Sequence, residues 1–99
     1  MEKLEKLLAS AEVVVLEFYS PRCHHCARME SAMRDISRLT SPATRIYAID
    51  VSENTQLSDE LGIEVTPEFV IFKNSEEVWR WPGEIDGWKL LAKINSYES

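Results

Sequence analysis

Cysteine, histidine, glycine and proline are all scarce in this chain, which has two cysteines, two histidines, three glycines and four prolines among 99 residues. Two cysteines cannot form the set of disulfides on which small secreted scaffolds depend. The scarcity of glycine and proline agrees with the absence of any repeat, low-complexity segment or linker. The longest aliphatic run, residues 13–16, is far too short to span a bilayer. We therefore expect a single domain over residues 1–99, in which 44% hydrophobic residues supply one modest core.

Positive charge is also in short supply, because eleven lysines and arginines face seventeen aspartates and glutamates, for a net charge of -6. Such a charge disfavours nucleic acid and anionic membranes as partners. The first ten residues, MEKLEKLLAS, alternate charge with leucine and lack the apolar core of a secretory signal. We expect a cytoplasmic monomer that binds no nucleic acid and no membrane, unless an export signal has been trimmed from the chain.

The spacing of apolar residues predicts three elements in the first half of the chain. Leucines three and four residues apart predict a helix over residues 2–10. Residues 13–19 are β-branched or aromatic and apolar on both faces except at Glu17, which is typical of a central strand. A 3.6-residue period then begins at Cys23, ends before Ser41-Pro42, and predicts one long helix.

The second half predicts a parallel crossover followed by a hairpin. Strands are expected at residues 45–51 and 69–72 and through Val78, Trp79 and Trp81, and the last two are joined by a turn at Asn74-Ser75. A short helix is expected between Ser52 and Gly62. Asp86 is expected to cap a last helix over residues 88–97. A strand, helix and strand in succession require a right-handed parallel connection. The fold class is therefore α/β, a mixed four-stranded sheet with helices on both faces.

Both cysteines and both histidines fall in one tetrapeptide, C-H-H-C, from Cys23 to Cys26. A structural disulfide here would close a four-residue ring and contribute about 2 kcal/mol, against roughly 3 kcal/mol for a fifteen-residue loop. A structural zinc site usually draws its ligands from two separated pairs, and the chain has no second pair, so we expect no metal. These two interpretations are the weaker alternatives, and both stay open.

A redox-active dithiol uses every feature of the tetrapeptide. The cluster lies at the carboxyl end of the first predicted strand, where open α/β sheets place their chemistry, and it begins the long helix. Unpaired N–H groups and the positive end of the helix dipole stabilise a thiolate on the first cysteine. Cys23 is therefore the candidate nucleophile and Cys26 the resolving thiol, while Arg22 and, when protonated, His24 or His25 add positive charge that would stabilise the thiolate.

Two separated segments resemble the thioredoxin superfamily. The segment VVVLEFYSPRCHHC is similar to the active-site strand of that family, most of all to the domains of protein disulfide isomerases. The segment LGIEVTPEFVIFKN is similar to its second signature, where a cis-proline opens a strand opposite the cysteines. The resemblance covers nearly the whole chain and implies a thioredoxin-like three-layer sandwich that lacks the family's first strand.

The resemblance also implies the function and the remaining site residues. It implies a thiol–disulfide oxidoreductase that reduces or exchanges disulfides in protein substrates, needs no cofactor beyond its dithiol, and receives electrons from a thiol reductase or the thiol pool. Glu17 would exchange protons with the resolving thiol, because burial in an apolar strand raises the pKa of a carboxyl; the alternative is a solvated Glu17 at a sheet edge. A substrate groove would be lined by Val65, Thr66, Pro67, Pro82 and Gly83.

Departures from the family pattern leave the redox direction open. Arg22 stands where the family has a tryptophan, Ala48 where it often has a lysine near the carboxylate, and Ser31 where it commonly has a helix-kinking proline. The alternatives are a disulfide oxidase or isomerase, and a non-catalytic binding module that uses the thiols as a redox sensor.

Overall fold

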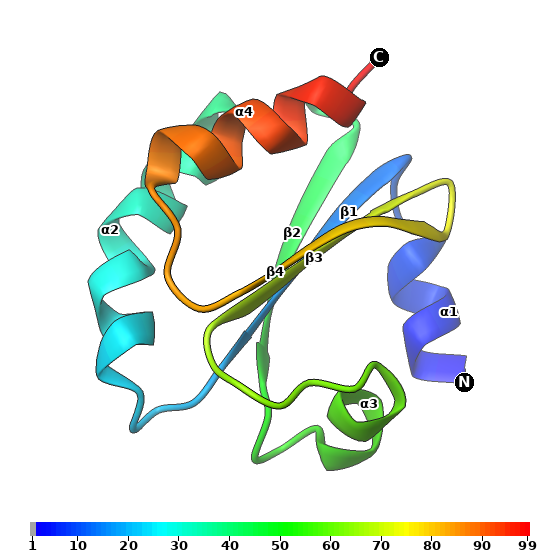
Figure 1. The fold of residues 1–99 in the computed structure, drawn as a ribbon. Helices are drawn as coiled ribbons and strands as arrows, with labels where there is room; N and C mark the ends of the chain where they lie inside the picture. The colour runs from blue at the N-terminus through cyan, green and yellow to red at the C-terminus, as the bar shows by residue number, and fades with distance from the viewer. Residues whose placement is uncertain (1) are drawn as a thin grey trace.

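A four-stranded sheet separates two pairs of helices in the computed structural model, which describes residues 2–99 (Figure 1). The strands are β1 (Val13–Tyr19), β2 (Thr44–Asp50), β3 (Glu68–Lys73) and β4 (Glu76–Pro82), and the helices are α1 (Glu2–Leu8), α2 (His24–Leu39), α3 (Thr55–Glu60) and α4 (Gly87–Tyr97). The sheet order is β2-β1-β3-β4, in which β1 and β2 are parallel and the other two pairs are antiparallel. The predicted element order and the mixed α/β architecture are confirmed.

The alternating side chains of the two central strands build a core on each face of the sheet. Val13 and Val15 of β1 pack with side chains of α2 and α4, whereas Val14 and Leu16 pack with side chains of α1 and α3. All four valine and leucine side chains are at most 1% exposed. A strand that is apolar on both faces is therefore covered on both faces, as the sequence predicts.

The strand register brings segments that are distant in sequence to the same end of the sheet. β1 and β2 run parallel, while β3 begins beside the end of β1, since Phe18 pairs with Glu68. The last residue of β4, Pro82, pairs with the same Glu68. Three segments consequently lie together at this end of the sheet: the one after β1, the one before β3 and the one after β4.

The second half of the chain differs locally from a regular helix and hairpin at the start of α3 and in the β3–β4 hairpin. Asn54, not the predicted Ser52, is the N-cap of α3, because the Ser52 N–H and hydroxyl both donate to the Asp50 carboxylate (2.9 and 2.7 Å). The β3–β4 turn is formed by Asn74 and Ser75, with φ of 50° and 69°, the left-handed geometry of tight hairpins. The β3–β4 pairing also has an irregularity between Ile71 and Phe72.

No helix within residues 2–99 combines the length and the apolar character that crossing a bilayer requires.

Candidate active site

The two cysteines form a disulfide at the first turn of α2. Cys23 is the N-cap of the helix, and its Sγ accepts a hydrogen bond from the backbone N–H of Cys26 (3.0 Å). Cys26 lies inside the helix and is only 6% exposed, whereas Cys23 is half-buried. The first sulfur thus faces solvent and helix N–H groups, and the second faces the protein interior.

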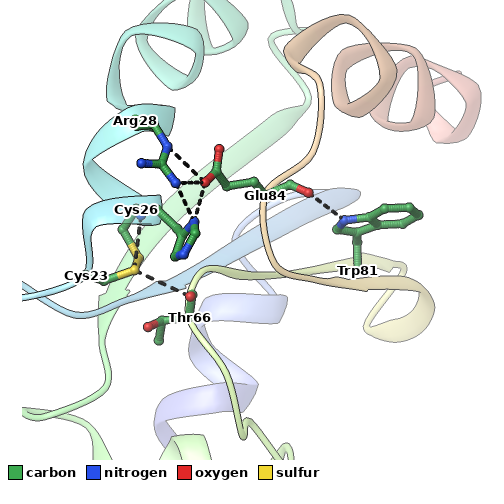
Figure 2. Close-up of polar contacts among 7 residues, drawn as sticks. Cys23, Cys26, Arg28, Thr66, Trp81 and Glu84 are labelled. Atoms are coloured by element: carbon green, nitrogen blue, oxygen red, sulfur yellow. Dashed lines mark hydrogen bonds and ion pairs between the residues drawn. A yellow bond between two sulfur atoms is a disulfide. The ribbon is translucent and has the colours of Figure 1, made fainter.

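A loop containing a cis-proline faces the first sulfur. The Thr66–Pro67 peptide bond is cis, and the Thr66 carbonyl oxygen lies 3.4 Å from Cys23 Sγ (Figure 2). Gly83 donates its N–H to the Pro67 carbonyl (2.7 Å) and has a φ of 91°, which favours glycine. Pro67 is buried, while Val65 (47% exposed) and Pro82 are open to solvent. The structure therefore brings together all five residues predicted to line the substrate groove.

Glu17 lies behind the disulfide in a cleft of about 280 Å³ that is also lined by Cys23, Cys26, Glu30 and Ala48. β1 is a central strand, so the alternative of a carboxylate at the sheet edge is wrong. Burial, and secondarily the negative charge of Glu30, raise the pKa of Glu17 from 4.5 to about 7. The raised pKa predicted from the sequence is confirmed, and a carboxyl of this pKa can accept or donate a proton near neutrality.

Near the disulfide, the carboxylate of Glu84, the guanidinium of Arg28 and the imidazole of His25 form a cluster. Glu84 Oε1 accepts hydrogen bonds from Arg28 Nε (3.0 Å) and Nη2 (2.5 Å), and it also contacts His25 Nδ1 (Figure 2). These hydrogen bonds, first from Arg28 and then from His25, lower the pKa of Glu84 from 4.5 to about 2. Trp81 Nε1–H donates to the Glu84 carbonyl (3.0 Å) and so fixes the backbone of the same residue.

The remaining predicted residues are exposed. Neither Arg22 nor His24 forms an ion pair within the described part of the chain, so their influence on Cys23 stays a prediction. No group of three or more histidine, cysteine, aspartate or glutamate side chains within residues 2–99 is arranged to hold a metal ion.

Sequence reasoning missed three residues of the site. Glu84 was not singled out, although it directly follows Pro82-Gly83, and Glu30 was missed although it lies one helical turn after Cys26. Arg28 was also missed; it is exposed, and its guanidinium binds Glu84. The helical spacing of His25 and Arg28, three residues apart, is the signal that could have placed them on one face.

Comparisons with known proteins agree with this geometry. A family model with the description Thioredoxin matches residues 2–96. The chain is 30% identical over 95 residues to Thioredoxin Y, chloroplastic, of Oryza sativa subsp. japonica, covering 96% of this chain and 55% of the rice protein. It is also 30% identical to a thioredoxin of Malassezia sympodialis, covering 99% of this chain and 93% of that protein.

Two further likenesses concern the isomerases and the fold. Protein disulfide-isomerase A6 of Mus musculus is 29% identical over 96 residues, which cover 93% of this chain and 21% of the mouse protein. The chain thus spans about half the length of the rice relative and about a fifth of the mouse relative. Among solved structures, a mutant thioredoxin from Halobacterium salinarum NRC-1 matches with a TM-score of 0.90 and 27% identity, over 100% of this chain and 86% of that one.

Proposed function

The chain belongs to the thioredoxin family, and on that premise we propose that it is a thiol–disulfide oxidoreductase whose Cys23–Cys26 pair reduces or exchanges disulfides in protein substrates. The observation that carries the proposal is the position of Cys23 Sγ, 3.4 Å from the Thr66 carbonyl and beside cis-Pro67. A carbonyl at the mouth of a groove offers an extended substrate chain a backbone hydrogen bond next to the reactive sulfur.

The reaction proceeds by two thiol–disulfide exchanges. The Cys23 thiolate attacks one sulfur of the substrate disulfide, a mixed disulfide forms, and the other substrate sulfur leaves as a thiolate and takes a proton. Cys26 gives its proton to Glu17 and attacks Cys23 Sγ, which forms the Cys23–Cys26 disulfide and releases the second substrate thiolate. The substrate gains the two electrons that the dithiol loses, and a thiol reductase or the thiol pool restores the dithiol.

Two properties of the chain support these roles. Cys26 is buried and Cys23 is not, so an incoming disulfide meets Cys23 first. Glu17 shares the cleft with Cys26 and has a pKa of about 7, so it can take the Cys26 proton near neutral pH and release it afterwards. We also propose a role in cell redox homeostasis, while a cytoplasmic location and a monomeric state remain predictions of the sequence.

The test is the reduction of insulin by dithiothreitol, followed by turbidity, with and without the protein. The wild type should accelerate precipitation of the insulin B chain well beyond dithiothreitol alone. Cys23→Ser should return the rate to that of dithiothreitol, while Cys26→Ser should accumulate a mixed disulfide with insulin that is visible by mass spectrometry. A folded wild type that gives no acceleration would contradict the proposal and favour the binding-module alternative.

A further inference from the structure

We propose that Glu84 is a positioning residue that sets the reduction potential of the Cys23–Cys26 pair by binding His25 and Arg28 and cancelling their positive charge. The proposal rests on the proposed function, because it concerns the same dithiol. Glu84 would make the Cys23–Cys26 couple less oxidising than the basic residues around the cysteines alone would make it.

The contacts tie Glu84 to the helix that carries both cysteines. His25 directly precedes Cys26, and Arg28 follows Cys26 by two residues. One oxygen, Glu84 Oε1, accepts from Arg28 Nε at 3.0 Å and Nη2 at 2.5 Å and contacts His25 Nδ1 (Figure 2). The carboxylate therefore lies against the first two turns of α2, where it contacts residues that do not line the Glu17 cleft.

The backbone of the loop holds this carboxylate in place. Gly83, the preceding residue, donates its N–H to the Pro67 carbonyl at 2.7 Å. The Glu84 carbonyl accepts from Trp81 Nε1 at 3.0 Å, and the Trp81 ring stacks on Trp79 with centroids 6.1 Å apart. Residue 84 is thus anchored on both sides, and the loop that lines the groove also presents the charge.

His25 stays in this cluster in either protonation state. Its Nδ1 lies within reach of both Glu84 Oε1 and Arg28 Nη2, the latter at 2.6 Å. A protonated Nδ1 donates to the carboxylate, and an unprotonated Nδ1 accepts from the guanidinium, so one partner suits each form. Glu84 and Arg28 together keep the imidazole oriented whether or not it is charged.

The charge balance gives the direction of the effect. The first turn of α2 contains no acidic residue, and exposed basic side chains lie beside it at Arg22, His24, His25 and Arg28. Glu84 supplies an opposing charge next to His25 and Arg28, and Glu17 and Glu30 supply carboxyls in the cleft that both cysteines also line. A negative charge near Cys23 disfavours its thiolate, which stabilises the disulfide relative to the dithiol and lowers the potential.

The test is the equilibrium of the oxidised and reduced protein with glutathione at pH 7 and low ionic strength, for wild type and the isosteric variant Glu84→Gln. We expect Glu84→Gln to shift the equilibrium roughly threefold toward the reduced protein, about 14 mV at 29.6 mV per tenfold. The double variant Arg28→Gln, Glu84→Gln should return the equilibrium toward wild type, because it removes the unpaired cation. Cys23 alkylation should accelerate and recover in parallel.

The control is Glu76→Gln, which removes the same charge at the start of β4, beside the hairpin turn at the opposite end of the sheet. It should leave the equilibrium unchanged, and 0.5 M salt should reduce the Glu84→Gln effect, since exposed charges are screened. An unchanged or lower potential in Glu84→Gln, or an equal change in Glu76→Gln, would overturn the proposal. The glutathione equilibrium needs no protein substrate, so failure to reduce insulin would contradict the proposed function and leave this test intact.

Discussion

Two glutamates lie near the disulfide, one exposed and one recessed, and the pKa values of the two carboxyls differ by about five units. On the exposed side Glu84 binds Arg28 and His25, and its pKa is lowered to about 2. On the recessed side Glu17 lies in a cleft with Glu30 and no cation, and its pKa is raised to about 7. The same functional group is therefore a fixed charge in one place and a carboxyl that titrates near neutrality in the other.

The difference shows how one small domain separates two tasks. The exposed carboxylate stays ionised over the physiological range, so it can influence the dithiol only through its charge and its hydrogen bonds. The recessed carboxyl changes protonation near neutrality, so it can take part in a step that moves a proton. Desolvation dominates on the recessed side, and ion pairing dominates on the exposed side.

The largest expected effect is a difference between the alkylation rates of the exposed sulfur and the recessed sulfur. In the reduced protein at pH 7, iodoacetamide should alkylate Cys23 at least about 100-fold faster than Cys26, because Cys23 faces solvent and helix N–H groups while Cys26 is buried. Peptide mass spectrometry over time measures both rates. Cys23→Ser and Cys26→Ser provide single-thiol controls, and rates within threefold of each other would contradict the assignment.

Removing the recessed carboxyl should stabilise the oxidised protein in a pH-dependent way. Between about pH 4.5 and 7 the folded chain keeps a proton on Glu17 that the unfolded chain has released, so the wild type loses stability as pH rises through this window. The difference in free energy of unfolding between Glu17→Gln and wild type should therefore grow in favour of the variant by roughly 2–3 kcal/mol from pH 4.5 to 7.5. Urea unfolding at several pH values measures it. Glu53→Gln, at an exposed site, is the control, and a pH-independent difference would refute the burial argument.

A smaller effect is expected from making the recessed side resemble the exposed one. Ala48 pairs with Glu17 in the β1–β2 register, lines the same cleft and is exposed, so a lysine fits there. Ala48→Lys should lower the pKa of Glu17 by about 1 unit, roughly 1.4 kcal/mol, because a cation favours the carboxylate. An NMR titration of the Glu17 carboxyl measures the shift. Ala48→Gln controls for size, and an equal shift in both variants would remove the electrostatic explanation.

Most of the fold could be predicted because hydrophobic patterning is strong where the strands are buried. The bounds of β1 agree with the predicted Val13–Tyr19, and α2 begins one residue after its predicted start at Cys23. The start of α3 was predicted wrongly, because the Ser52 hydroxyl binds Asp50 two residues earlier instead of capping the helix. Local side-chain competition of this kind leaves no periodic signal.

The site was predictable where its residues are contiguous or carry a motif, and not where distant side chains meet. The dithiol lies within four residues, and the cis-proline follows from the second segment that resembles the family. His25 and Glu84 are 59 residues apart, and their contact depends on the path of the loop after β4. Periodicity reports which face is buried, and it does not report which charges from separate elements will pair.

The edge strand β4 has a consequence for how the molecule behaves at high concentration. An open sheet edge invites pairing with another chain and hence aggregation. β4 counters this with an irregular register against β3 and with Arg80, which pairs with Glu77 (2.9 Å) and Glu68 (3.2 Å). Pro82 ends the strand without an N–H to offer. Pro82 thus also discourages the sheet from growing into a fibril.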